Sequence, residues 1–204
     1  MEEIHRISTS NEPDLTVSWK TGVRVLGVSE SFKKDQERSV VVGVVMRGDL
    51  RIDGFGLCRP RVGGMDATEQ LISMYRRMQR GDIRAWILGG GVISWFNIVD
   101  LESLFQETDI PVVCVSYEDS EGLEKYIKEY FPDDCEERLA ALRKAGERES
   151  VLLGTGHSVF LLASGMGANR AKRLVNLFTL DGKVPEPVRV ARTLAAAVQR
   201  DMET

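Results

Sequence analysis

One carboxylate in this chain stands where a helix is expected to begin. Asp66 opens the segment Asp66-Ala67-Thr68-Glu69, which matches a capping box with Asp in the place of Ser or Thr. As a cap, the Asp66 side chain would stabilise the first helical turn by about 1 kcal/mol. One carboxylate oxygen can cap while the other points outward, so a ligand or metal contact is compatible with the cap. The residues alone leave both interpretations open.

A glycine-rich run is the second feature with possible chemistry. Gly89, Gly90 and Gly91 follow an apolar segment and precede Trp95-Phe96-Asn97. Such glycines indicate either a tight turn leaving a sheet or a place where backbone N–H groups approach a ligand phosphate. The run has neither the Lys-Ser/Thr of a P-loop nor the spacing of a dinucleotide fingerprint. Asn97 is expected either near a helix N-terminus or as a polar contact in the site.

Ser29 and Glu30 end another apolar segment. Side chains alternate along a strand, so these two point to opposite faces and only one can face a given site. Glu30 is a candidate metal or substrate ligand, although a glutamate at a strand end is usually solvated. Arg59 and Arg61 belong to a run of basic residues whose default interpretation is a solvated face. If they line the same edge as Asp66, they could hold a backbone phosphate.

The hydrophobic pattern predicts the elements that position these residues. β-branched and apolar segments predict strands over residues 23–30, 39–47, 50–58, 83–88 and 110–117, with an edge hairpin within 151–162. Helical spacing predicts helices over residues 66–80, 98–108, 168–180 and 189–202, and two more within 120–146 that break at Pro132.

Three antiparallel strands followed by strand–helix–strand units is the order of a ribonuclease H-like fold. We therefore expect an α/β protein with a mixed sheet flanked by helices, and a doubly wound sheet is the competing interpretation. Residues 1–20 are polar and predict an extended lead, before a single domain over residues 21–204 that ends in the C-terminal helices.

The composition describes an ordinary soluble globular protein of 204 residues, 43% hydrophobic and 28% charged. The net charge of −4 argues against nucleic-acid binding driven by overall charge, but it leaves room for a local basic groove. Three widely spaced cysteines fit a reducing compartment, and the first residues do not match a signal peptide. A cytoplasmic location is expected. With two histidines, a His-rich metal site is excluded.

Several longer motifs carry a family resemblance that runs roughly from Val23 to Ala197. They are Arg24-Val25-Leu26-Gly27, Val44-Val45-Met46-Arg47-Gly48, Ile52-Asp53-Gly54, Gly64-Met65-Asp66-Ala67-Thr68, Phe96-Asn97-Ile98-Val99-Asp100, Pro111-Val112-Val113 and Pro185-Glu186-Pro187-Val188-Arg189-Val190-Ala191. Together they resemble the archaeal proteins of unknown function that are regarded as endonuclease V homologues. The resemblance implies a ribonuclease H-like fold.

The resemblance also implies a chemistry and shows where this chain departs from it. Endonuclease V cuts nucleic acid near deaminated purines, with acidic residues that hold a divalent metal. Its three acids fall on Ser29, Asp66 and Gly89, so this chain keeps one, with Glu30 beside the first position. Mg²⁺ or Mn²⁺ would be held weakly, by Asp66 and Glu30, which are also the candidate catalytic residues.

Three functions follow as hypotheses. The first is a domain that binds nucleic acid, DNA or RNA, or a nucleotide-like ligand, with little or no hydrolysis; Ser29, Gly89, Gly90, Asn97, Arg59 and Arg61 are its candidate ligand contacts. The second is a divalent-metal-dependent endonuclease for deaminated nucleic acid, with Asp53 or Asp100 completing a rearranged site. The third is a protein-interaction scaffold whose contact face is the helical end over residues 185–202.

Overall fold

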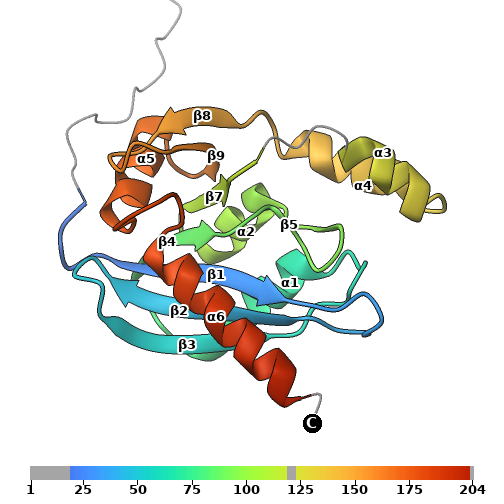
Figure 1. Cartoon of the computed structure of the whole chain (residues 1–204), viewed down its shortest axis with the longest axis horizontal. Helices are drawn as coiled ribbons and strands as arrows, with labels where there is room; N and C mark the ends of the chain where they lie inside the picture. The colour runs from blue at the N-terminus through green and yellow to red at the C-terminus, as the bar shows by residue number, and fades with distance from the viewer. Residues whose placement is uncertain (1–18, 119–122, 203–204) are drawn as a thin grey trace, which may run out of the picture.

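A seven-stranded mixed sheet forms the centre of the protein, as the computed structural model shows for residues 19–118 and 123–202 (Figure 1). Its strands run in the order β3-β2-β1-β4-β7-β9-β8. They are β1 (Arg24–Ser31), β2 (Val40–Arg47), β3 (Ile52–Cys58), β4 (Ile83–Leu88), β7 (Val112–Ser116), β8 (Glu149–Leu152) and β9 (Ser158–Ser164).

The sheet confirms the predicted order of strands. β1, β2 and β3 form an antiparallel meander, and β4 and β7 continue the sheet parallel to β1. β9 pairs antiparallel with β7, and β8 pairs antiparallel with β9 and is the edge strand. All of β2 from Val40 to Met46 is buried, as its continuous apolar sequence predicts for a strand covered on both faces.

Helices cover both faces of the sheet and make a three-layer molecule. On one face lie α5 (Ala168–Leu177) and α6 (Glu186–Asp201), and α6 crosses β1 and β2 (Figure 1). On the other face lie α1 (Ala67–Met78) and α2 (Leu101–Thr108). The pair α3 (Leu123–Tyr130) and α4 (Cys135–Lys144) stands beside the sheet on a small core of its own. No helix of the described part is long and apolar enough to cross a membrane.

Two helices begin three residues away from the predicted start, each for a local reason. α6 begins at Glu186, three residues early, because Pro187 fits the first helical turn where its missing N–H is not needed. α2 begins at Leu101 rather than 98, because Asn97 and Ile98 form the short strand β6 (Asn97–Ile98). β6 pairs with β5 (Val92–Ile93) in a hairpin that the sequence pattern did not indicate.

Candidate functional site

The β5–β6 hairpin turns through three consecutive residues in the left-handed region. Ser94, Trp95 and Phe96 have φ angles of 48°, 57° and 63°. Each such residue other than glycine stores about 1–3 kcal/mol of strain and persists only when surrounding contacts determine its conformation. Contacts with other segments of the site therefore hold this loop in its conformation.

Glu30 at the end of β1 is one of these contacts. Its Oε2 accepts hydrogen bonds from the backbone N–H of Ser94 at 2.5 Å and from the Ser94 hydroxyl at 2.8 Å. The hydroxyl of Ser39 lies 2.6 Å from that of Ser94, and the carbonyl of Ser94 accepts from the N–H of Gly63 at 2.7 Å. Burial raises the pKa of Glu30, although the two bonds from Ser94 lower it. Glu30 thus serves as an internal acceptor.

Asn97 on β6 connects the hairpin to Asp66 and to α1. Its fully buried side chain donates to Asp66 Oδ1 at 2.8 Å and to the carbonyl of Arg61 at 3.0 Å. Its Oδ1 accepts from the N–H of Ala67 at 2.9 Å, so it caps α1 from outside. Asn97 does lie at a helix N-terminus, but at that of α1 rather than of the helix that follows it.

The capping-box prediction for Asp66 is wrong. Asp66 occupies the N-cap position, but its backbone angles (φ −103°, ψ 5°) are not those of an extended cap residue. Its carboxylate turns back to the N–H of Arg61 at 3.0 Å and to the side chain of Asn97. The N–H of Ala67, the first residue of α1, is capped by Asn97 instead.

Arg138 on α4 is the residue of this site that the sequence pattern did not reveal. Its side chain is 4% exposed and donates to the carbonyls of Gly63, Gly64 and Phe96 at 2.7–3.1 Å. It also pairs with Asp134 at 2.7 Å, and its hydrogen bonds lower the pKa of that carboxyl. The i,i+4 spacing of Asp134 and Arg138 was the available signal, but it reads equally well as an exposed pair.

Ser29 and Gly89 meet on the opposite face of the sheet, under α6. A Cβ added at Gly89 would lie 3.6 Å from the Ser29 hydroxyl and only 2.6 Å from Cγ1 of Val188. Glu30 faces the hairpin instead, as strand alternation predicts. Glu30 therefore does not supply a carboxylate on the face where Ser29 and Gly89 stand.

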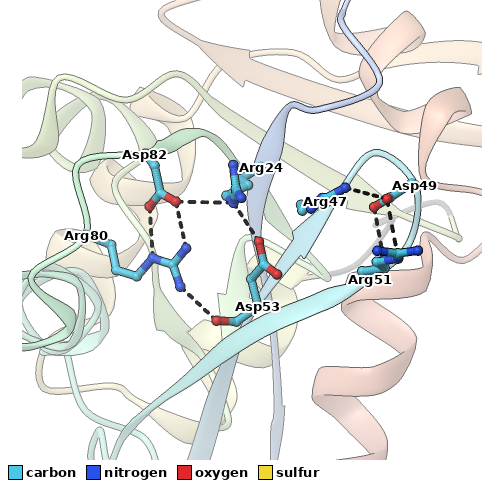
Figure 2. Close-up of polar contacts among 7 residues, drawn as sticks. All are labelled: Arg24, Arg47, Asp49, Arg51, Asp53, Arg80 and Asp82. Carbon is cyan, nitrogen blue, oxygen red and sulfur yellow. Dashed lines mark hydrogen bonds and ion pairs between the residues drawn. The ribbon is translucent and has the colours of Figure 1, made fainter.

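Asp53 and Asp100, the candidates for a rearranged site, are engaged elsewhere. Asp53 pairs with Arg24 at 2.6 Å, at the opposite end of β1 from Glu30, in the network with Arg80 and Asp82 that Figure 2 shows. Asp100 caps α2 by accepting from Ser103 at 3.0 Å, and it pairs with Lys144 at 2.6 Å. The structure does not bring Asp53 to Asp66 and Glu30.

The two predicted phosphate contacts, Arg59 and Arg61, are exposed and lie beside Asp66 through their shared segment. Arg61 faces Arg38 in an isolated bridge, and the carbonyl of Arg59 accepts from the Arg38 side chain at 2.8 Å. Both arginines thus belong to the segment that leads from β3 to Asp66, and their contact with a phosphate stays a prediction.

A cavity of about 550 Å³ opens beyond the carboxyl ends of β4 and β7. The backbone of residues 89–91 forms one wall, and apolar side chains form much of the rest. Ser116, Tyr117 and Arg148 are among the polar groups on its surface. Gly90 lines it in a conformation (φ 131°) that suits glycine, so the glycine-rich run makes a turn at the rim.

Comparison with known proteins places the chain in a family. The family model described as endonuclease dU matches residues 21–199. The chain belongs to the endonuclease dU family. A UPF0215 protein of Methanosarcina barkeri is 35% identical over 182 residues, which cover 88% of this chain and 92% of that protein. A UPF0215 protein of Pyrobaculum calidifontis is 34% identical, over 85% of this chain and 96% of that one.

Solved structures confirm the ribonuclease H-like fold. A protein of unknown function from Archaeoglobus fulgidus has a TM-score of 0.76 at 31% identity, covering 86% of this chain and 98% of that one. Endonuclease V of Ciona intestinalis, solved with a DNA containing inosine, has a TM-score of 0.61 at 13% identity, covering 92% and 90%. Human ENDOV has the same TM-score at 17% identity, covering 89% and 86%. The two endonuclease V structures show a shared fold.

The likeness to endonuclease V implies a divalent metal, and the residues present in this member of the endonuclease dU family do not fit one. Mg²⁺ prefers carboxylate and other oxygen ligands. Glu30 Oε2 and Asp66 Oδ1 each already accept two hydrogen bonds from the protein, and Val188 fills the space beside Gly89. Within residues 19–118 and 123–202, no three His, Cys, Asp or Glu side chains are grouped to hold a metal ion.

Proposed function

We propose that this member of the endonuclease dU family binds nucleic acid at the carboxyl ends of β1, β4 and β7, with little or no hydrolysis. Ligands of open α/β sheets bind beyond the carboxyl ends of the strands, and here that edge carries the cavity of about 550 Å³. The exposed Arg59 and Arg61 supply positive charge at the edge that holds Asp66. The Ciona endonuclease V, which shares the fold, was solved with DNA.

One observation carries the second half of the proposal. The retained carboxylate of Asp66 and the neighbouring candidate Glu30 are both acceptors inside the protein framework, Glu30 for the strained loop and Asp66 for Arg61 and Asn97. Two-metal hydrolysis needs carboxylates that bridge ions about 4 Å apart. A carboxylate that holds a loop in a strained conformation cannot turn to a metal without releasing that loop.

Binding and cleavage are tested with the same oligonucleotides. Fluorescence anisotropy with labelled strands that contain uracil, inosine or neither, in EDTA, is expected to show binding that weakens as salt rises. A cleavage gel with Mg²⁺ or Mn²⁺ is expected to show intact strands for the wild type and for Asp66→Asn. The Asn variant keeps an oxygen acceptor for Arg61, so we expect its fold to be retained. Absence of binding at low salt would contradict the proposal.

The name of the family favours a second function, a divalent-metal-dependent endonuclease acting on deaminated nucleic acid. It would require Asp66 and Glu30 to leave their present partners and to gain a third ligand. Metal-dependent cutting by the wild type that Asp66→Asn abolishes would establish this function and overturn the non-hydrolytic one. Cutting that Asp66→Asn leaves unchanged points to a contaminating nuclease.

The scaffold hypothesis stays a prediction. The residues of α6 that are buried, Val188, Ala191 and Ala195 among them, pack on the sheet rather than forming a free contact face. A protein partner that stays bound after nuclease treatment would support the scaffold hypothesis.

A further inference from the structure

Five aromatic side chains gather beside the strained loop. Trp95 and Phe96 come from the loop, and Tyr126, Tyr130 and Phe131 come from α3 and its end; together they are the aromatic platform. Ring centroids of Trp95 lie 5.0 Å from Phe131 and 5.8 Å from Tyr130, and Tyr130 lies 6.1 Å from Tyr126. Two segments about thirty residues apart in sequence thus form one continuous π surface.

The outer part of the platform is open to solvent. Tyr126 and Tyr130 are 45% and 43% exposed, and their rings are parallel within 6°. They are four residues apart on α3, so they share one face of the helix. The anchoring residue of α3 is the buried Ile127, which packs with Ile98 and Leu139. The core of the α3–α4 pair therefore explains Ile127 but does not require two stacked tyrosines at the surface.

A cation stands over this surface. The ammonium of Lys34 lies 5.4 Å from the ring centroid of Trp95 and 5.5 Å from that of Tyr130. Lys34 is exposed. The charged side chains of α3 itself are two acids and two lysines and sum to zero, so Lys34 is the cation that stands over the rings. Flat rings with a cation above them are complementary to a base and its phosphate.

The platform is continuous with the proposed binding edge. Glu30 fixes Ser94, the residue before Trp95, and Arg138 donates to the carbonyl of Phe96 and lies 3.9 Å from the Phe131 ring centroid. Gly63 packs so closely that an added Cβ would lie 3.1 Å from Trp95 and 3.2 Å from Phe131. The strained conformation of the loop therefore places the Trp95 indole beside α3.

We propose that the aromatic platform stacks the bases of a single-stranded nucleic acid, with Lys34 contacting its phosphate. This inference rests on the proposed nucleic-acid binding and assigns the form of nucleic acid that is bound. Unpaired bases expose the faces that aromatic side chains need, whereas in a duplex those faces are covered by neighbouring base pairs. A single strand is therefore preferred over a duplex of the same sequence.

The test compares a fluorescein-labelled (dT)₂₀ with its duplex, by anisotropy in EDTA. The double variant Tyr126→Ala/Tyr130→Ala is expected to weaken (dT)₂₀ binding between about fivefold and a hundredfold, the range for loss of base stacking. Tyr126→Phe/Tyr130→Phe keeps the rings and is expected to bind like the wild type. Phe55→Ala is the matched control, since Phe55 is 48% exposed on β3. Circular dichroism melts check that each variant is folded.

A second readout does not depend on affinity. Quenching of tryptophan fluorescence on addition of (dT)₂₀ is expected in the wild type and in Phe55→Ala, and it is expected to fall sharply in Trp95→Phe. Equal (dT)₂₀ affinity of the wild type and Tyr126→Ala/Tyr130→Ala would overturn the platform and leave the proposed function intact. Equal affinity for single strand and duplex would overturn the single-strand assignment. Absence of any binding by the wild type would overturn both proposals.

Discussion

The Glu30 carboxylate accepts two hydrogen bonds from Ser94, which stabilise the folded chain. Its half-buried charge destabilises the folded chain. Burial raises its pKa above the ordinary value of 4.5, against the smaller effect of the bonds from Ser94. Below pH 4.5 the carboxyl is protonated in folded and unfolded chains alike. Above it, the unfolded chain releases the proton while the folded chain still keeps it. Rising pH therefore lowers the free energy of unfolding through this group, until the raised folded pKa is passed.

Glu30→Gln removes the charge and keeps an oxygen acceptor for Ser94. We expect the free energy of unfolding of the variant, minus that of the wild type, to increase as pH rises from 4.5 toward neutrality. Urea melts at a series of pH values measure this difference. Glu37→Gln is the control for loss of a glutamate charge at the surface, since the Glu37 side chain is 80% exposed and its substitution is expected to change stability little. Parallel pH profiles for Glu30→Gln and the wild type would contradict the buried-charge account.

Single residues of the site were predictable as candidates but not in their roles. The types and positions of Glu30, Asp66 and Asn97 marked all three as candidates, because a polar side chain at the expected end of an element is visible in a sequence. Their partners were not visible, since Asn97 caps a helix that begins thirty residues earlier. Arg138 was not predicted for the same reason. Its hydrogen bonds to the carbonyls of Gly63 and Phe96 join distant segments, and no local sequence pattern encodes them.

At the scale of elements, α6 and the sheet share the space where the third family acid falls. Gly89 lets α6 approach, because an added Cβ would lie 2.6 Å from Cγ1 of Val188. Gly89→Asp is expected to destabilise the protein by about 1–3 kcal/mol through overpacking. Val188→Ala removes the clashing methyl groups, so the double variant should lose less stability than the sum of the two single losses. Denaturant melts of all four proteins complete the cycle.

The sign of the coupling in that cycle decides the interpretation. A favourable coupling of about 1 kcal/mol or more is expected, since the two side chains compete for one volume. Additive losses would mean that the loop after β4 moves aside and that α6 does not restrict the position.

Every element of ordinary length could be predicted from its periodicity. The two-residue strands β5 and β6 could not, because they are too short to show a pattern and depend on contacts with Glu30 and Arg138.

For the whole molecule, the order of strands was enough to predict the layers. Antiparallel strands followed by strand–helix–strand units leave few ways to connect a sheet, so the pattern favoured the ribonuclease H-like arrangement over a doubly wound sheet, and the family resemblance implied the same fold. Overall charge gave less information: the net value of −4 hides a surface on which Lys34, Arg59 and Arg61 stand near one edge. A local distribution of charge arises from folding and is not contained in a sum over the chain.

That distribution predicts how binding responds to salt. If the three cations each neutralise about one phosphate of a single strand, the logarithm of the affinity should fall with the logarithm of salt concentration with a slope of roughly −2. Lys34→Gln is expected to make this slope shallower by roughly 0.7, because one fewer counterion is released.

Arg84→Gln is the matched control, since Arg84 is exposed near the start of β4, away from residues 89–91. Anisotropy titrations with (dT)₂₀ at four salt concentrations give the slopes. An unchanged slope in Lys34→Gln would show that Lys34 does not meet a phosphate, and an equal change in both variants would show that the strand follows overall charge rather than the edge at Asp66.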